Sequence, residues 1–278
     1  MTDHTHQTAP TQFVETDGIR FAYRRFGNPR GLPIVLNQHF RGTLDYWDPA
    51  VTNGLARTRE VILFNNAGIA SSSGETPTSI EQMARDALSF IQALDLPKVD
   101  ILGFSIGGLV AQEIVLQKPS LVRKLILVSA GLRGADMSLS KAAGVFGASY
   151  DLPEDLWLAI HFTASAASRI AGHAFLRRMT ERMDRDPEVS EQAALRQREA
   201  INRYLASAED TPTYLGRFAL PALIVQGGDD IMMPASNAFA LQRNMPNAQL
   251  ILYPDANHAP IYRHPELFVR HANIFLDF

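Results

Sequence analysis

The sequence predicts an α/β protein: a mainly parallel, eight-stranded sheet with helices on both faces and an inserted helical cap. Short apolar runs such as Val61–Phe64 alternate with segments of helical spacing such as Thr78–Leu94. Wholly apolar strands are typical of parallel sheets that are buried on both faces. A glycine-flanked turn joins one strand to the next helix, and one long stretch, 131–212, shows only helical patterns between two strands. Together these observations indicate a sheet with an insertion.

The first two strands are expected to form a hairpin. Phe13–Thr16 and Ile19–Arg24 alternate in polarity, and Asp17-Gly18 between them is typical of a tight turn. Such a hairpin adds antiparallel strands to the edge of the sheet. Six further strands are predicted at Pro33–Asn37, Val61–Phe64, Val99–Leu102, Leu125–Val128, Pro221–Gln226 and Gln249–Tyr253.

Helices are predicted between these strands. Ser79 and Gln82 stand near the start of one apolar-periodic segment, as in a capping box. Pro265 lies in the first turn of the closing helix, a position that suits proline. The helices expected against the sheet are Thr78–Leu94, Gly108–Leu116, Ala235–Arg243 and Pro265–Leu276.

The stretch 131–212 is expected to be a helical cap over the ends of the strands. It contains three helical patterns, Leu156–Ala167, Ala171–Met183 and Glu191–Ala206, and prolines punctuate it. Because the stretch lies between two strands of one sheet, we interpret it as an insertion rather than as a second domain.

The remaining chain divides into a core and a tail. Residues 12–130 and 213–278 are expected to form one core domain. Residues 1–11 are polar and are expected to form a flexible N-terminal tail. His4 and His6 lie in this tail, where fraying is expected more than metal binding.

Composition excludes several classes of function. The net charge is −3 and the pI is about 6.2, so neither a nucleic acid nor a membrane surface is the expected partner. The chain has no cysteine, which excludes disulfides and thiolate chemistry and fits a reducing cytoplasm. No signal-peptide pattern is visible at the N-terminus. We therefore expect a cytoplasmic monomer or homodimer that acts on a small-molecule substrate.

The most informative stretch is Gly103-Phe104-Ser105-Ile106-Gly107. It follows an apolar strand pattern and opens a helical one. A serine with glycines at positions −2 and +2, between a strand and a helix, is typical of a nucleophile elbow. The turn is tight enough to exclude side chains beside the serine, and the N-terminus of the following helix points at the reacting centre. Ser105 is therefore the candidate nucleophile.

A serine hydroxyl needs a base, and that base needs an orienting carboxylate. In this architecture the chain order is serine, then acid, then histidine. Asp229 and Asp230 both follow the strand that ends at Gln226. Asp230 is the preferred acid, and Asp229 is the alternative, which would otherwise serve as a turn or cap residue.

His258 is the predicted base. It follows the last strand, in the turn-forming cluster Asp255-Ala256-Asn257-His258. Among the eight histidines, it has both the strand-end position and the chain order that the triad requires. His161 and His173 lie in the predicted cap; they are candidate lining residues of the pocket but lack a strand-end setting.

An oxyanion needs two N–H donors that are already in place. The backbone N–H of Ile106, directly after Ser105, is one expected donor. The other is expected in the loop after Pro33–Asn37, with the backbone N–H of Phe40 preferred. His39 in the same loop is expected to be structural more than chemical, although it is also a candidate lining residue of the substrate pocket.

The cap is expected to supply part of an apolar substrate pocket. Phe146 and Trp157 are candidate lining residues, and Met232 beside Asp230 fits an apolar entrance. Apolar residues at helical spacing are more often core than pocket, so these assignments are weaker than the triad. Arg41 is the one cation near the site, which argues against a strongly anionic substrate.

The chain resembles the capped serine-hydrolase branch of the α/β-hydrolase fold superfamily. The resemblance covers nearly the whole chain after the tail. It rests on Gly103–Gly108, on Gly227-Gly228-Asp229-Asp230 with Pro234, and on Asn257-His258-Ala259-Pro260. The acid of the family pattern falls on Asp230. The resemblance further implies that Trp47 helps to wall the site, while by position alone Trp47 could equally belong to the core.

Three departures from the family pattern leave the subfamily open. The usual His-Gly after the third strand is His39-Phe40 here. The usual acid of the loop after the fourth strand is Asn65, and the histidine is preceded by Asn257 rather than glycine. The serine at position 105 argues against the branches of this fold that use an aspartate nucleophile.

The predicted reaction is acyl transfer to water, with no metal and no organic cofactor. The expected substrate is a small to medium, mostly apolar carboxylic ester or lactone. Carbon–carbon bond hydrolysis and perhydrolysis use the same triad and remain alternatives. A ligand receptor with slow residual turnover is a reading from a different class, which fast multiple turnover would exclude.

Overall fold

We describe a computed structural model of the chain, which covers residues 4–135, 144–145, 148–149, 153–207 and 211–278. It contains one eight-stranded sheet in the order β1-β2-β4-β3-β5-β6-β7-β8, which confirms the predicted fold class. The strands are β1 (Gln12–Thr16), β2 (Ile19–Gly27), β3 (Ile34–Asn37), β4 (Glu60–Phe64), β5 (Val99–Phe104), β6 (Val122–Val128), β7 (Ala222–Gly227) and β8 (Ala248–Tyr253).

The sheet is antiparallel only around β2. This strand is antiparallel to both β1 and β4, whereas the strands from β4 to β8 pair in parallel. Parallel pairing brings the carboxyl ends of β3, β5, β7 and β8 to the same edge of the sheet. Ligand sites of open α/β sheets lie at that edge.

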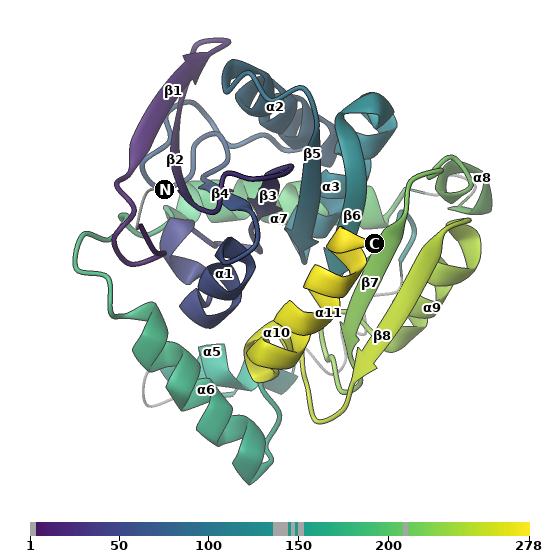
Figure 1. Cartoon of the computed structure of the whole chain (residues 1–278). Helices are drawn as coiled ribbons and strands as arrows, with labels where there is room; N and C mark the ends of the chain where they lie inside the picture. The colour runs from purple at the N-terminus through teal and green to yellow at the C-terminus, as the bar shows by residue number, and fades with distance from the viewer. Residues whose placement is uncertain (1–3, 136–143, 146–147, 150–152, 208–210) are drawn as a thin grey trace.

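Helices cover both faces of the sheet (Figure 1). On one face lie α2 (Ile80–Ala93), α3 (Ile106–Gln117) and α9 (Ala235–Asn244). On the other lie α1 (Pro49–Ala56) and α11 (Pro265–Asp277), the latter preceded by the short α10 (Pro260–Arg263). Successive strand residues such as Ile101 and Leu102 belong to the two different cores, as the period of two in a strand requires.

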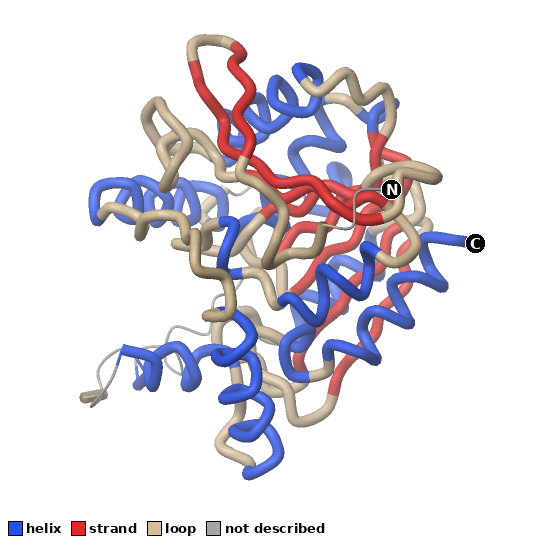
Figure 2. The backbone as a smooth tube through the Cα atoms, turned by 60° about the vertical axis from the view of Figure 1, so that its left-hand side comes forward, coloured by secondary structure: helices blue, strands red, loops and turns tan. Residues whose placement is uncertain are grey.

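The connection between β6 and β7 contains α5 (Pro153–His161), α6 (Ala166–Met179), α7 (Glu191–Leu205) and α8 (Thr211–Leu215). In Figure 1, α5 and α6 stand apart from the sheet layers, at the end toward which the arrows of β5 and β8 point. The turned view of Figure 2 also shows helices that lie beyond the end of the sheet. This placement puts α5 over the strand ends that carry the candidate site.

The first predicted helix of this connection is too long in the prediction. The sequence predicted one helix over Leu156–Ala167, but α5 ends at His161 and a new helix begins at Ala166. Ser165 caps α6 by accepting a hydrogen bond from the N–H of Ser168, and Thr163 N–H donates to the Ser168 hydroxyl. Hydroxyl side chains compete with helical hydrogen bonds, and here they start a new helix.

The prediction also missed α1. Its signal is present in the sequence, because Asp48 accepts a hydrogen bond from Ala50 N–H and Pro49 occupies the first helical position.

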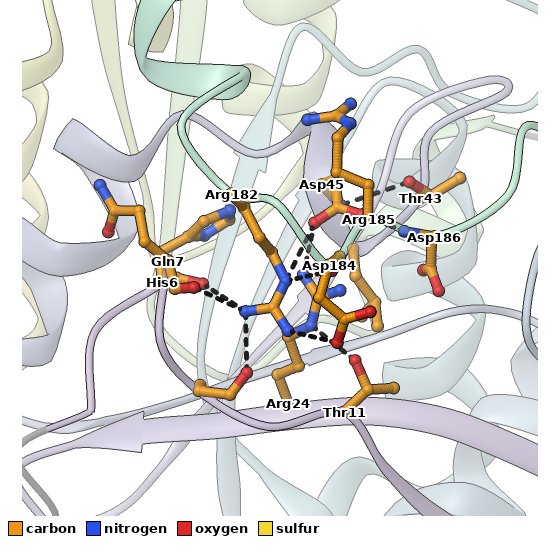
Figure 3. Close-up of polar contacts among 12 residues, drawn as sticks. His6, Gln7, Thr11, Arg24, Thr43, Asp45, Arg182, Asp184, Arg185 and Asp186 are labelled. Atoms are coloured by element: carbon orange, nitrogen blue, oxygen red, sulfur yellow. Dashed lines mark hydrogen bonds and ion pairs between the residues drawn. The ribbon is translucent and has the colours of Figure 1, made fainter.

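Residues 4–11 differ from the expected flexible tail. His6 and Ala9 are buried, and His6 N–H donates to Asn53 on α1. Arg182, which follows α6, donates to the carbonyls of Gln7 and Ala9 at 2.9 Å (Figure 3). The apolar Ala9 and the polar contacts of the backbone hold this segment, and its polar composition gives no hint of them.

Figure 3 also shows how charge is balanced beneath this segment. Asp45 accepts from Arg24 at 2.5 Å and from the backbone N–H of Asp186. Arg24 and Asp45 are both buried, so each charge needs the other as a partner. The network joins β2, the loop after β3 and the chain that leads into α7.

Candidate active site

Ser105 sits in a strained turn between β5 and α3. Its φ is +55° and its ψ is −120°, a backbone conformation that residues other than glycine rarely adopt. A Cβ on Gly107 would lie 2.1 Å from the carbonyl oxygen of Asn37, and a Cβ on Gly103 would lie 2.3 Å from that of Gly107. The two flanking glycines are therefore required by backbone contact, as the elbow pattern predicts.

The imidazole of His258 faces the Ser105 hydroxyl. His258 follows β8, and its Nε2 lies 2.9 Å from Ser105 Oγ. Its Nδ1 lies 3.0 Å and 3.1 Å from the two carboxylate oxygens of Asp230. A carboxylate only accepts, so we assign the ring proton to Nδ1. Nε2 is then free to accept the hydroxyl proton of Ser105.

Asp230 is fixed by donors on every side. Its Oδ1 accepts from the backbone N–H groups of Met232 and Met233 at 2.8 and 2.9 Å. Its Oδ2 accepts from Gln226 Nε2 at 2.8 Å. Asp229, the alternative acid, is exposed, and its backbone N–H donates to Ala256 O at 3.0 Å. The geometry thus favours Asp230 over Asp229.

Two backbone N–H groups are available beside Ser105. Within the part of the chain that the structure describes, the N–H groups of Phe40 and Ile106 have no hydrogen-bond acceptor. Ile106 is the first residue of α3, where N–H groups have no partner within the helix. The next N–H of the other loop, that of Arg41, donates to Gln197 on α7. Phe40 is therefore the better placed of the two loop residues.

An aromatic cluster lies next to the triad residues. The ring of His161, on α5, stacks on Trp157 with 3.9 Å between ring centroids. It lies 5.6 Å from the His39 ring and 6.1 Å from the His258 ring. The ring of Tyr46 also stacks on Trp157. Thus α5 places His161 beside His258 and places Trp157 behind it, against His39.

The two extra histidines of this cluster are held neutral. Burial lowers the pKa of His39 to about 4. Burial is also the main cause that lowers the pKa of His161 well below its usual value, and the neighbouring His39 and His258 add to this effect. His39 Nδ1 donates to Phe40 O at 2.8 Å, and His161 Nδ1 donates to Trp157 O at 2.9 Å. The His39 hydrogen bond lies within the loop that carries the Phe40 N–H.

The other predicted pocket residues divide into three groups. Trp157 belongs to the aromatic cluster, and Met232 flanks Asp230. Trp47 is fully buried in the core against Phe104, which is the alternative that its position left open. Phe146 lies outside the described residues.

A cavity of about 840 Å³ lies beside the site. Its lining comes from α5, α6 and the loops that carry Asp230 and His258, and it includes Leu158, Phe162, Ile231 and Asn257. Neither Ser105 nor His258 lines it.

Sequence reasoning gave no role in the site to Gln226 or Asn257, and it named His161 only as a candidate lining residue from the cap. Gln226 donates to Asp230, and Asn257 contacts both the acid loop and α5. His161 needs the placement of α5 to be recognised. Gln226 had a signal, because it is a polar residue inside an otherwise apolar strand.

Two classes of feature are absent from the described ranges. No group of three or more His, Asp or Glu side chains there is arranged to hold a metal ion. No helix among the same residues is long and apolar enough to cross a membrane.

Comparison with known proteins places the chain in a family. A family model described as alpha/beta hydrolase fold matches residues 33–265. The chain is 40% identical to an alpha/beta hydrolase fold protein from Chitinophaga pinensis, with a TM-score of 0.91 and 99% of each chain covered. It is 27% identical over 242 residues to the protein named "Putative carbamate hydrolase RutD" of Agrobacterium fabrum, covering 84% of this chain and 89% of that one.

A more distant structure shows the same fold. The enol-lactonase from Burkholderia xenovorans LB400 is 18% identical, with a TM-score of 0.76 over 96% of this chain and all of that one. The match of the family model over most of the chain shows that this protein belongs to the alpha/beta hydrolase fold family.

Proposed function

We propose that this protein is a serine hydrolase that cleaves a small to medium, mostly apolar carboxylic ester or lactone. One observation carries the proposal: the hydrogen-bonded chain from Ser105 through His258 to the buried Asp230, with the serine in a strained elbow. A chain of nucleophile, base and orienting acid is the arrangement that activates a serine hydroxyl.

The geometry suits a two-step reaction. Ser105 Oγ attacks the carbonyl carbon while His258 Nε2 takes its proton, and Asp230 stabilises the imidazolium that forms. The N–H groups of Phe40 and Ile106 donate hydrogen bonds to the developing oxyanion. His258 then protonates the leaving oxygen, and an acyl group remains on Ser105. Water, deprotonated by His258, attacks this acyl-enzyme and frees the serine. These steps need no metal and no organic cofactor.

The surroundings support an uncharged acyl group. The half-buried Trp157 and Tyr46 supply aromatic surface, and burial keeps His39 and His161 neutral. Arg41, which lies in the loop after β3 beside Phe40, pairs with Glu191 at 2.5 Å. An anionic acyl group would therefore lose its hydration without gaining a free cation from this loop.

We also propose that α5–α7, within residues 131–212, act as the cap expected from the sequence. The position of α5 at the carboxyl ends of the strands supports this role, as do its contacts with the histidine loop. A cap of this kind covers the bound substrate and expels bulk water from around its carbonyl group.

Carbamates are a second candidate class, because the RutD relative is named a carbamate hydrolase. A carbamate carbonyl is attacked by the same serine and differs from an ester only in the group attached to its carbon. Lactones differ in that the leaving oxygen stays tethered to the acyl group.

The test is a panel of substrates assayed with the wild type beside Ser105→Ala. The panel contains p-nitrophenyl esters of graded acyl length, lactones, aryl carbamates and a vinylogous ketone for carbon–carbon cleavage. We expect multiple turnover on esters or lactones by the wild type, reduced about 10⁴-fold or more in the variant. Turnover of the vinylogous ketone alone would replace ester hydrolysis by carbon–carbon hydrolysis. No turnover on any substrate by folded protein would contradict the proposal and favour a receptor.

A further inference from the structure

Asn257 joins three parts of the site through one side chain. Its Oδ1 accepts a hydrogen bond from the backbone N–H of Ile231, in the loop that carries Asp230, at 3.0 Å. Its Nδ2 donates to Ala159 O at 3.1 Å and to Phe162 O at 3.4 Å, at the end of α5. Asn257 is only 5% exposed, so water does not replace these partners. The residue directly before the proposed base is therefore tied to both neighbours of that base.

The backbone of the same loop continues the contact with α5. His258 N–H points to Ile160 O at 3.4 Å, and Ala259 N–H points to His161 O at 3.3 Å. The last carbonyls of a helix have no partner within it and are free to accept such bonds. These distances exceed the usual 2.9–3.0 Å, so each bond is individually weak. The Asn257 amide makes the shortest hydrogen bond between the loop and α5.

Asparagine is well suited to this position. The amide must present its oxygen to the N–H of Ile231 and its nitrogen to two carbonyl oxygens. A single planar amide does both at once, since it carries two donors and one acceptor oxygen. The glycine that the family pattern has at this position has no side chain and would make neither contact.

The arrangement makes the position of His258 depend on α5. Ser105 is fixed by its own turn, and Asp230 by the N–H groups of its own loop together with Gln226 from the end of β7. The imidazole of His258 contacts Asp230 through Nδ1, and its loop is also held from outside, because Asn257 and two backbone N–H groups tie it to the last turn of α5. A displacement of about 1 Å in a catalytic group can cost about 10²-fold in rate.

We propose that Asn257 is a positioning residue, which holds His258 in line with Ser105 by docking the histidine loop on the end of α5. The proposal rests on the proposed function, in which His258 is the base. It implies that the helical connection does more than cover the site: its α5 helix completes the alignment of the base.

The sharpest test is Asn257→Asp. This change keeps an acceptor for Ile231 N–H but turns an oxygen toward the carbonyls of Ala159 and Phe162, so it breaks the contact with α5 selectively. The primary readout is the rate at which a fluorophosphonate reacts with Ser105, because this rate reports the alignment of serine and base without any natural substrate. We expect a fall of about 10²-fold, with kcat for an ester falling in parallel and KM changing little.

Two further variants make the result decisive. Asn244→Asp is the matched control, since Asn244 Nδ2 also donates to a backbone carbonyl, that of Ala240, but on α9. We expect it to react at the wild-type rate. Asn257→Ala removes the tether without adding a charge, and we expect a fall of about tenfold. It decides the question if Asn257→Asp does not fold, as judged by circular dichroism and thermal unfolding.

The outcomes separate this proposal from the proposed function. A wild type that does not react with the fluorophosphonate would overturn serine hydrolysis and the positioning role together. A reactive wild type, with folded Asn257 variants that react equally fast, would overturn the positioning role alone. A parallel loss in Asn244→Asp would show that the effect is not specific to α5, and would also overturn it.

Discussion

Ser105 Oγ and His258 Nε2 lie 2.9 Å apart, yet the two residues are held by different kinds of contact. The serine is positioned by the backbone of its own turn, where a Cβ atom added at Gly103 or Gly107 would collide with a carbonyl oxygen. The histidine contacts Asp230, and its loop is held by polar contacts with α5, which is distant in the sequence. Local steric contact is rigid and visible in a short motif. Long-range polar contact depends on a second element being in place, so we expect the two sides of the site to fail in different ways.

The largest effect is expected where the two sides meet. Asp230→Asn removes the acceptor that holds the Nδ1 proton of His258, so that the imidazole presents the wrong tautomer to Ser105. We expect kcat for an ester to fall by about 10⁴-fold while the fold is kept. The exposed neighbour provides the control, because Asp229→Asn should retain wild-type activity. Steady-state kinetics of both variants checks this, and equal losses would contradict the assignment of the acid.

The serine side is best tested by its glycines. In Gly107→Ala the new Cβ would lie 2.1 Å from Asn37 O and 2.7 Å from Gln38 O, so α3 must move away from the end of β3. We expect unfolding to become easier by roughly 2–4 kcal/mol, measured by urea denaturation. Gly144→Ala is the control, since no atom of the described residues lies within 4 Å of its added Cβ. A stable and active Gly107→Ala would show that the turn is less constrained than we describe.

A smaller effect is expected at the polar contacts of the N-terminal segment. Burial lowers the pKa of His6 to about 3, so the folded state resists a proton that the unfolded state accepts below about pH 6.5. The stability contributed by neutral His6 is therefore complete above pH 6.5 and is lost progressively as the pH falls toward 3. Between pH 7 and pH 5 this loss amounts to about 2 kcal/mol.

The substitution His6→Gln removes this titration while keeping a polar side chain beside Thr52. We expect its free energy of unfolding to fall by about 2 kcal/mol less than that of the wild type between pH 7 and pH 5. His173→Gln, at an exposed histidine, should follow the wild type. Urea denaturation at the two pH values measures the difference, and identical slopes for wild type and His6→Gln would contradict the buried, neutral state of His6.

The same contrast explains what the sequence could predict. Ser105, Asp230 and His258 each follow a strand within a short turn signal, and the parallel sheet brings those turns to one edge, so all three were identified as candidates. The contacts of His161 and Asn257 depend on where α5 lies, and no local pattern encodes that. The early end of α5 depends on hydroxyl contacts that periodicity does not register.

The departure at Asn65 shows the same limit. The sequence marks it as a missing acid, but the structure supplies a carboxylate from elsewhere in the chain. Asn65 Nδ2 donates to Asp186 at 2.7 Å, and its Oδ1 accepts from Leu44 N–H at 3.0 Å. An aspartate at position 65 would repel Asp186, so the amide and the distant carboxylate form one unit. Only the fold reveals that the two positions are linked.

The most direct measurement for the whole account is to stop the reaction with a p-nitrophenyl ester by acid and to map the acyl group by peptide mass spectrometry. The account predicts that the peptide containing Ser105 carries the acyl group, and that Ser105→Ala carries none. An acyl group on another residue, or turnover without any acyl-enzyme when deacylation is slowed by a bulky acyl chain, would contradict the central claim that Ser105 is the nucleophile.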